Sequence, residues 1–319
     1  MKKVRKTVHK VGAPGRARAN LPLLVRFWGT RGSIPSPGPE TVRFGGNTAC
    51  VELRVGGRIV ILDAGTGIRK LGLRLLQEAA GKPIQAVILF THTHWDHIQG
   101  LPFFVPFFRR GSEFYLCGQR GVMKLEHVMH GQMDAPFFPV SFAELPAKII
   151  FHELDTSVFE ANGVVITALP LNHPGGAYGF RISWRGKTMV FMTDNDALAE
   201  VVAPLARGRR TGKKKAAPEL SAQDQSFIDF CQGADLLIHD CQFTLGEYVQ
   251  RRSWGHSSIE AVMELAHRAA VKQVAFFHHD PEHDDEFIDQ MVEIGRALAL
   301  ERNPRLQVFA AAEGMELQL

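Results

Sequence analysis

The sequence has no uninterrupted apolar run of the ~18 residues that a membrane-spanning helix requires, which argues against a membrane protein. Cysteine is also scarce: the four cysteines are widely spaced, form no CxxC pair and predict no disulfide framework. We interpret them as buried thiols of a cytoplasmic protein. The net charge of +4 is too small for the chain as a whole to be a polycation. Histidine, in contrast, is plentiful, with 14 residues, several of them clustered.

Two basic segments interrupt an otherwise ordinary globular composition. Residues 1–21 are rich in Lys and Arg but lack the apolar segment of a signal peptide, so we expect a disordered, solvated tail. The segment at about 204–222 carries six cationic side chains and few apolar ones. Because like charges at this density repel, it is predicted to be a solvated surface loop. The remainder, 22–319, is expected to form a single domain.

The pattern of apolar residues predicts an α/β fold, with a strand-rich first half and a second half in which strands alternate with helices. Gly56-Gly57 separates two strand-like runs and is a signal for a short hairpin. Helices are predicted at 68–80, 258–270 and 285–299. Strands are predicted at 23–28, 49–55, 58–62, 84–90, 114–118, 148–152, 164–169, 179–183, 189–192, 236–238, 274–277 and 307–311.

Four potential metal ligands lie within six positions, directly after the apolar strand 84–90: His92, His94, Asp96 and His97. An extended loop can direct alternate side chains at a common point. One ion cannot easily take all four ligands from so short a segment, whereas two neighbouring ions can share them. Ordinary surface or capping histidines are not expected at this density, so the segment predicts a metal centre.

The segment THTHWDH resembles the HxHxDH signature of the metallo-β-lactamase-fold hydrolases, and the resemblance extends over about 290 residues, which is most of the chain. It implies a four-layer αββα sandwich with two mixed β-sheets flanked by helices. It also implies that Asp63, in LDAGTG, hydrogen-bonds the ligand loop, as carboxylates behind a metal site commonly do. Three further positions match family ligands: His173 in LNHPGG, Asp194 in MTDND and His278 in FFHHDP.

The resemblance implies two divalent metal ions, each held by three residues, with Asp194 and a water or hydroxide bridging them. The implied sets are His92, His94 and His173 for one ion, and Asp96, His97 and His278 for the other. Imidazole and carboxylate donors without thiolate favour Zn²⁺ and leave Mn²⁺ or Fe²⁺ open. His279 neighbours His278, but adjacent residues of a strand face opposite ways, so we predict that His278 is the ligand.

The stretch from 236 to 278 resembles the phosphodiesterase branch of this family, which includes the tRNA 3′-processing endonucleases and bacterial cyclic phosphodiesterases. The resemblance implies that His256 protonates the leaving oxygen as general acid and that Asp240 orients it. Asp96 would in addition direct the proton of the attacking hydroxide. Two plainer interpretations remain: a histidine at a helix N-terminus without a catalytic role, and a carboxylate that only caps a strand end.

The predicted substrate is a small or cyclic nucleotide phosphodiester. The first-strand loop and residues 131–140 resemble a bacterial subgroup described as 3′,5′-cyclic-nucleotide phosphodiesterase-like. Residues 98–172 contain no Gly/Pro-rich arm of the kind found in tRNA-processing enzymes. The basic segments, in contrast, favour an RNA-processing nuclease, because phosphate backbones attract them. An ester or lactone hydrolase, and a ligand-binding member without turnover, are further alternatives.

Six phenylalanines lie near the ligand loops in the sequence, at 103, 104, 107, 108, 137 and 138. They could stack on a nucleobase, or they could form part of the core or a contact between subunits. We expect a homodimer with a small-molecule phosphodiester substrate, no membrane association, and nucleic acid as the alternative partner.

Overall fold

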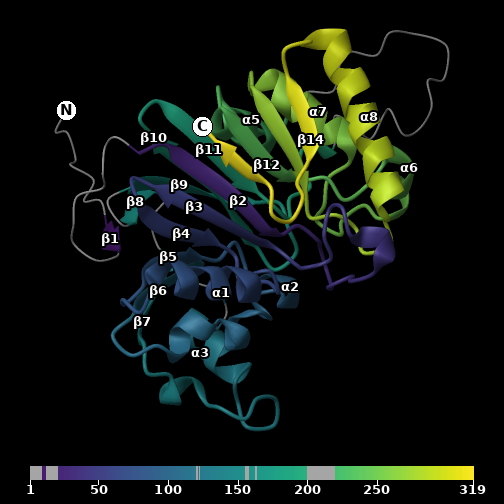
Figure 1. The fold of residues 1–319 in the computed structure, drawn as a ribbon. Helices are drawn as coiled ribbons and strands as arrows, with labels where there is room; N and C mark the ends of the chain where they lie inside the picture. Colours follow the sequence, from purple (N-terminus) through teal and green to yellow (C-terminus); the bar gives the residue numbers. More distant parts are fainter. Residues whose placement is uncertain are drawn as a thin grey trace.

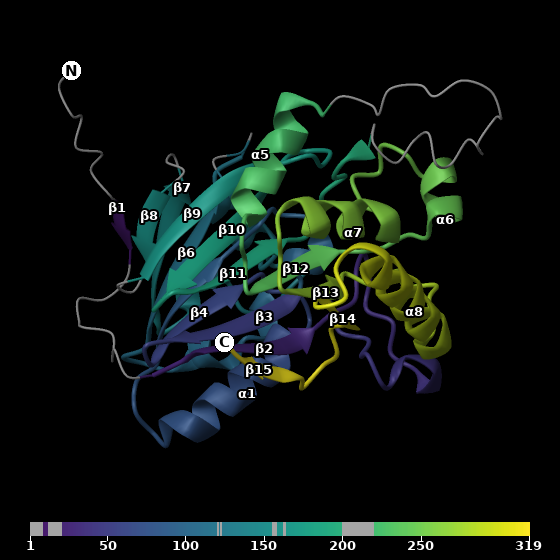
Figure 2. The same ribbon diagram turned by 90° about the horizontal axis from the view of Figure 1, so that it is seen from above.

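The computed structural model describes residues 9–11, 21–119, 121, 123–154, 158–161, 164–199 and 220–319. Two mixed β-sheets pack face to face, and helices cover the outer face of each (Figures 1 and 2). This four-layer αββα sandwich confirms the predicted fold class. Among the described helices, none is both long enough and apolar enough to cross a membrane.

The first sheet has seven strands in the order β15-β2-β3-β4-β5-β6-β7. Strands β15, β2, β3 and β4 pair in antiparallel fashion, and β4 to β7 are parallel. The strand bounds are β2 (Leu23–Gly29), β3 (Cys50–Val55), β4 (Arg58–Leu62), β5 (Gln85–Leu89), β6 (Glu113–Gln119), β7 (Lys148–Leu154) and β15 (Glu316–Gln318). The outer face is covered by α1 (Ile68–Ala79), α3 (Leu125–Gly131) and the short helices η2 (Leu101–Phe103) and η3 (Val105–Phe108). Two further short helices are η1 (Pro39–Thr41) and η4 (Phe142–Glu144).

The second sheet has eight strands in the order β1-β8-β9-β10-β11-β12-β13-β14. From β11 onward the strands are parallel, and β11, β12 and β13 are nearly continuous in buried residues, as expected for strands covered on both faces. The strand bounds are β1 (His9–Val11), β8 (Val158–Ala161), β9 (Val164–Leu171), β10 (Ala177–Trp184), β11 (Lys187–Met192), β12 (Leu236–Asp240), β13 (Gln273–Phe277) and β14 (Gln307–Ala310). The helices on this side are α5 (Ala222–Cys231), α6 (Leu245–Gln250), α7 (Ile259–Arg268) and α8 (Asp285–Arg302).

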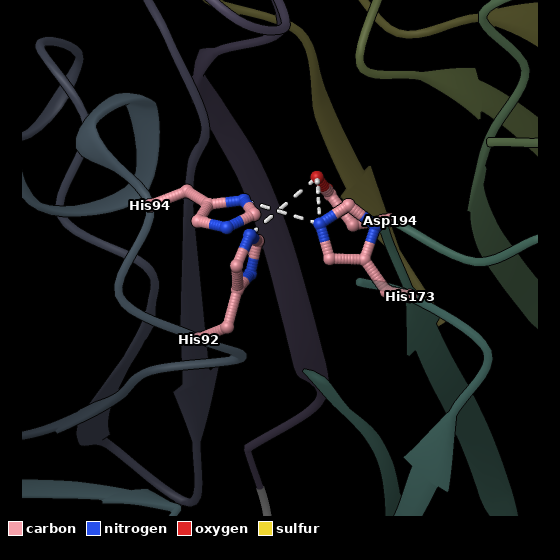
Figure 3. A group of neighbouring side chains, drawn as sticks. All are labelled: His92, His94, His173 and Asp194. Carbon is pink, nitrogen blue, oxygen red and sulfur yellow. Dashed lines mark hydrogen bonds and ion pairs between the residues drawn. The ribbon is translucent and has the colours of Figure 1, made fainter. Parts of the chain in front are cut away.

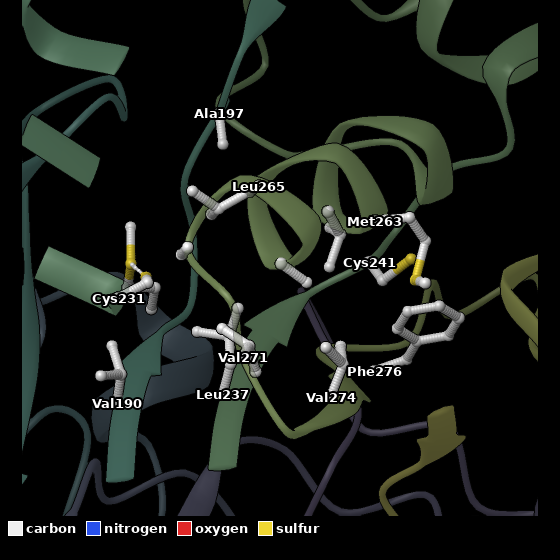
Figure 4. Packing of buried hydrophobic residues seen from close by; sticks show 14 of the residues in the cluster. Val190, Ala197, Cys231, Leu237, Cys241, Met263, Leu265, Val271, Val274 and Phe276 are labelled. Carbon is white, nitrogen blue, oxygen red and sulfur yellow. Dashed lines mark hydrogen bonds between the residues drawn. The ribbon is translucent and has the colours of Figure 1, made fainter. Parts of the chain in front are cut away.

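Three apolar cores fill the spaces between the four layers. The central core lies between the sheets, where Phe277 contacts the rings of Phe27 and Phe191. A second core lies beneath α1 and α3. The third lies between the parallel strands and helices α5, α7 and α8, where Leu265 and Val274 belong to one cluster (Figure 4). These cores hold the carboxyl ends of the strands in fixed positions.

The two basic segments are described only in part. Residues His9–Val11, inside the predicted disordered tail, form β1 and pair in parallel with β8, so the prediction does not hold for these three. The physical reason is that an edge strand such as β8 offers unpaired backbone groups to a neighbouring segment. All six cationic residues of the predicted loop lie outside the described residues. The described residues begin again at Leu220. Ser221 caps α5 by accepting a hydrogen bond from Asp224 N–H.

Candidate metal centre

The candidate metal centre lies at the end of the sandwich where strands of both sheets finish. The segment 92–97 follows β5, His173 follows β9, Asp194 follows β11 and His278 follows β13. Residues that follow the carboxyl ends of parallel strands meet at one edge of a sheet, which is why segments distant in the sequence converge here. The structure brings all seven predicted ligands together, in the two groups that the resemblance implied.

The first group consists of His92, His94, His173 and Asp194, whose donor atoms all lie within 4.8 Å of one another (Figure 3). His173 Nε2 lies 3.1 Å from His94 Nδ1. Asp194 Oδ2 lies 3.6 Å from His92 Nε2 and 3.8 Å from His173 Nε2. Three imidazoles and one carboxylate oxygen that face a common point form a typical donor set for a divalent cation.

The second group consists of Asp96, His97, His278 and again Asp194. Asp194 Oδ1 lies 3.2 Å from His97 Nε2 and 3.3 Å from His278 Nε2. Asp96 Oδ2 lies 3.2 Å and 3.0 Å from the same two nitrogens. Asp194 therefore directs Oδ2 at the first group and Oδ1 at the second, as a bridging carboxylate does.

Two buried nitrogens at the centre, His92 Nε2 and His97 Nε2, have no hydrogen-bond partner among the described residues. A buried polar atom without a partner costs free energy, so such atoms call for a bound group that satisfies them. A divalent cation would do so at both positions. Together with the thiol-free donor set, this observation fits a pair of divalent metal ions.

The ionisation of the centre also suits cations. Burial by itself raises the pKa of Asp194, but the imidazoles of His278, His97 and His92 hold that pKa well below its usual range. The pKa of the buried Asp96 is likewise held well below its usual range, chiefly by His97 and His278. Burial lowers the pKa of His92 far below its usual value. Ionised carboxylates and a neutral imidazole are the forms that bind metal.

Contacts behind the centre orient its imidazoles. His97 Nδ1–H donates to Asp63 Oδ2 at 2.9 Å, and Asp63 Oδ1 accepts from Thr91 N–H at 2.8 Å. This agrees with the structural role that the resemblance implied for Asp63. His173 Nδ1–H donates to the carbonyl of Gly255 at 3.1 Å. In each histidine the Nε2 atom is thereby left for the centre.

Three residues at the centre have left-handed backbone conformations that few side chains adopt readily. The φ angles are 59° at Asp63, 57° at Asp194 and 58° at His278. Each residue stands directly, or nearly directly, after the end of a strand. Asp and His are among the residues that adopt this region more readily than most.

His279 is oriented away from the centre. Its Nε2–H donates to the carbonyl of Ala311 at 2.9 Å, and burial lowers its pKa to about 3. His278, in contrast, contacts both Asp96 and Asp194. Both residues lie beyond the end of β13, and the left-handed backbone at His278 turns the chain between the two rings.

His256 and Asp240 lie beside the metal-ligand groups. His256 Nδ1 lies 3.4 Å from Asp240 Oδ2, and the His256 ring centroid is 5.1 Å from that of His278. Asp240 is fully buried, which raises a carboxyl pKa, but the neighbouring imidazoles of His239 and His256 lower this pKa overall. Asp240 is therefore an ionised carboxylate that faces Nδ1 of the His256 ring, beside the metal-ligand groups.

Asp240 is itself fixed by two backbone donors that the sequence analysis missed. Asn195 N–H donates to Asp240 Oδ1 at 3.2 Å, and Ser257 N–H donates to Oδ2 at 3.0 Å. Ser257 Oγ–H also donates to the carbonyl of Asn195 at 2.6 Å. The two donors to Asp240 are backbone N–H groups, so residue types carry no signal for these two contacts. The only available signal was that both residues adjoin predicted site residues.

Two cavities flank the centre, separated by the loop 173–176. A cavity of about 270 Å³ lies beside His92 and His94, and its other described lining residues are Phe90, Thr93, Gly121, Met123, Leu125, Val128, Gly175 and Gly176. A more open cavity of about 600 Å³ lies beside His173, and its other described lining residues are Asn172, Pro174, Asp196, Ala199, Arg252, Ser253 and Gly255. The first has Phe90, Met123 and Leu125 among its lining residues, and the second has Asn172, Asp196 and Arg252 among its own.

The six phenylalanines do not line either cavity among the described residues. Phe104 and Phe107 are buried in the core beneath α1. Phe103 is 55% exposed and Phe137 is 73% exposed, and Phe103 contacts the ring of Phe138. The structure therefore gives no support to base stacking by these residues. It assigns part of the set to the core and part to the surface.

Comparisons with known proteins agree with the fold. A family profile described as "Beta-lactamase superfamily domain" matches residues 58–209. The Ribonuclease Z of Synechococcus sp. (strain CC9311) is 28% identical over 295 residues, covering 81% of this chain and 88% of that protein. The metallo-beta-lactamase fold protein YhfI from Bacillus subtilis has a TM-score of 0.62 at 19% identity, covering 93% and 99% of the two chains. A diphosphatase from the PhnP family has a TM-score of 0.62 at 18% identity, covering 93% and 98%.

The four-layer sandwich and the two groups of converging side chains define a metallo-β-lactamase-fold protein. Residues 58–209 match the beta-lactamase superfamily domain, and the chain is similar to metallohydrolases of the phosphodiesterase branch.

Proposed function

We propose that this protein hydrolyses phosphodiester bonds at a centre of two divalent metal ions, with Zn²⁺ as the resident ion. The observation that carries the proposal is the position of Asp194, which turns one carboxylate oxygen to each ligand group. When bound, the two cations would lower the pKa of a water molecule and balance the charge on the phosphoryl oxygens.

His256 is proposed to donate a proton to the leaving oxygen. Its Nδ1 faces Asp240, so Nε2 is left for the substrate. An imidazole held by a carboxylate suits this role, because it can give up a proton near neutral pH. Asp240 is proposed to fix the orientation of His256. Asp96, a proposed ligand, is also placed to accept a proton from the attacking water.

For the substrate we favour a small phosphodiester of nucleotide size. One cavity lies beside His92 and His94 and the other beside His173, so the two substituents of a diester could each occupy one. Phe90, Met123 and Leu125 in the cavity of about 270 Å³ suit an apolar or aromatic substituent, and Asn172 and Ser253 in the larger cavity suit a hydroxylated one. A 3′,5′-cyclic nucleotide is one such diester.

An RNA-processing nuclease is the second candidate. It is favoured by the similarity to the Ribonuclease Z of Synechococcus over 81% of the chain. The same groups would act on an internucleotide phosphate, since the chemistry at phosphorus is unchanged. The two candidate functions differ in the size of the groups attached to the phosphate that is hydrolysed.

A panel of substrates separates the candidates. Metal-reconstituted protein would be assayed on bis-p-nitrophenyl phosphate, 3′,5′- and 2′,3′-cyclic nucleotides, and an RNA with a 3′ extension. We expect turnover of small diesters and a loss of ~10²-fold or more in His256→Ala. His267→Ala, on the exposed face of α7, is the matched control and should retain activity. Cleavage of the RNA alone would favour the nuclease. No diester turnover with two ions bound would overturn the proposal.

A further inference from the structure

Arg31 stands in the turn that follows β2, and its side chain is fully buried. Its guanidinium makes four hydrogen bonds to three backbone carbonyls. Nη1 donates to Asp280 O at 2.9 Å and to His283 O at 2.7 Å, while Nε and Nη2 donate to Gly45 O at 3.2 Å and 3.1 Å. Burial of a cation costs several kcal/mol unless its donors are satisfied, so these bonds fix the side chain firmly.

The backbone around Arg31 is fixed to the segment that follows β13. Gly32 N–H donates to His279 O at 2.9 Å, and His279 N–H donates to Thr30 O at 3.0 Å. The guanidinium reaches further along the same segment, to Asp280 and His283. Arg31 therefore ties the turn of residues 30–33 to the segment that carries His278.

The turn of residues 30–33 contacts two members of the second ligand group. Ser33 N–H donates to Asp96 Oδ2 at 2.8 Å. Gly32 lies flat against the His278 ring, so closely that a Cβ atom there would stand 2.3 Å from His278 Nδ1. The turn thus limits the positions of one carboxylate and one imidazole at the same time.

The first ligand group has different supports. Among the described residues, no hydrogen bond joins the turn of residues 30–33 to His92, His94 or His173. His92 Nδ1 instead lies 3.1 Å from Thr91 Oγ1, and His173 is held by the carbonyl of Gly255. Displacement of the turn would therefore affect one group and spare the other.

We propose that Arg31 is a positioning residue for the second metal ion, the one assigned to Asp96, His97, Asp194 and His278. The guanidinium holds the turn, the turn holds Asp96 and His278, and these two side chains hold the ion. The inference rests on the two-ion centre of the proposed function. It concerns metal affinity, which is measured without substrate.

The test is a titration of metal-free protein with Co²⁺. Calorimetry and visible absorption spectroscopy monitor the binding. Wild-type protein is expected to bind two ions per chain. Arg31→Met should keep one site at wild-type affinity and bind the second ion on the order of 10–100-fold more weakly, the range typical for residues that orient ligands. The visible absorption spectrum of Co²⁺ bound at the second site should also differ between Arg31→Met and the wild type. Arg31→Lys keeps the charge but cannot bridge the same carbonyls, and it should show a partial loss.

Arg181→Met is the matched control. The Arg181 guanidinium, on β10, also donates to backbone carbonyls, to Phe230 O at 2.7 Å and Gln232 O at 3.1 Å. This variant should bind both ions as the wild type does. Gly32→Ala removes no buried charge, yet its Cβ would displace His278, so it should reproduce the selective loss even if Arg31→Met fails to fold.

Equal weakening of both ions in Arg31→Met and Gly32→Ala, or unchanged affinity for the second ion, would overturn the inference. A wild-type chain that binds a single ion would overturn it too, because no second ion would then need positioning. In contrast, absence of diester turnover with two ions bound would overturn the proposed function and leave this inference intact.

Discussion

Asp194 and His278 show how much single residues contribute at this centre. Asp194 uses its two carboxylate oxygens separately, one for each ligand group. His278 contacts both carboxylates of the second group and lies against the backbone of Gly32. His279 is adjacent in sequence, but its ring is committed to Ala311 O.

The two neighbouring histidines therefore make a sharp test of the ligand assignment. We expect His278→Gln to lose tight binding of one metal ion, because the amide cannot reproduce the imidazole nitrogen between Asp96 and Asp194. His279→Gln should retain both ions and lose about 1–2 kcal/mol of unfolding free energy, through the disturbed bond to Ala311 O. Metal analysis of dialysed protein and denaturant unfolding measure the two effects. Loss of metal in His279→Gln alone would reverse the assignment.

At the scale of elements, the strands and helices with long apolar patterns were predictable from the sequence. Strand β12 and helices α1, α7 and α8 lie where their patterns indicated. The elements missed are short or lie at edges, apart from helix α5, whose ten residues were not predicted to be helical. Strands β1, β8 and β15 have three or four residues, and their existence depends on neighbouring strands that a local pattern cannot show. Helices α3 and α6 have seven and six residues, too few for a clear period.

The residues of the site likewise divide into those that could be predicted from the sequence and those that could not. The seven predicted ligands could be found because imidazole and carboxylate side chains cluster in the sequence or match family motifs. Ser33 and Asn195 could not, because each acts through a backbone N–H that every residue except proline possesses. Ser257 likewise holds Asp240 through its backbone N–H, although its hydroxyl adds a bond to Asn195 O. Arg31 was also missed, since a buried arginine in a turn looks like a surface residue until its partners are known.

Helix caps provide a prediction at this scale. Ser258 Oγ accepts from Ala261 N–H at the start of α7, and Asp284 Oδ1 accepts from Phe287 N–H at the start of α8. Ser258→Ala and Asp284→Ala should each lower the unfolding free energy by about 1 kcal/mol. Only Ser258→Ala should also reduce turnover, because α7 begins three residues after His256. Equal activity of the two variants would show that the helix start does not hold His256.

For the whole molecule, the centre joins the two sheets. Asp96 and His97 follow a strand of the first sheet, whereas Asp194 and His278 follow strands of the second. An ion held by all four would therefore oppose separation of the sheets. The central apolar core already resists that separation, so the metal adds to a fold that has its own stability.

Metal removal tests this linkage. A chelator should lower the melting temperature, and Zn²⁺ should restore it. The stabilisation amounts to about 2.7 kcal/mol per ion at a free concentration of 100 times the dissociation constant. Differential scanning calorimetry with and without chelator measures the shift. An unchanged melting temperature, with metal loss verified, would mean that the unfolded chain binds the ions equally well.

The predicted homodimer concerns the surface of the whole molecule. Phe103 and Phe137 are exposed, and the ring of Phe103 contacts Phe138, so apolar surface gathers there. If this patch forms the subunit contact, Phe137→Asp should shift the protein from dimer to monomer in light scattering. Glu126 on α3 is exposed, and the control variant Glu126→Lys should leave the oligomeric state unaltered. A monomeric wild-type protein would refute the predicted homodimer.

At Asp63, Asp194 and His278 the backbone is left-handed, so the side chains that serve activity at these positions lower the stability of the folded chain. Such conformations cost non-glycine residues free energy, and glycine adopts them without that cost. Laboratory evolution for heat resistance of the metal-free protein, in the presence of a chelator and with turnover unmonitored, should therefore drift toward glycine at these three positions. The more heat-resistant proteins that result would have lost two proposed metal ligands and the carboxylate that orients His97.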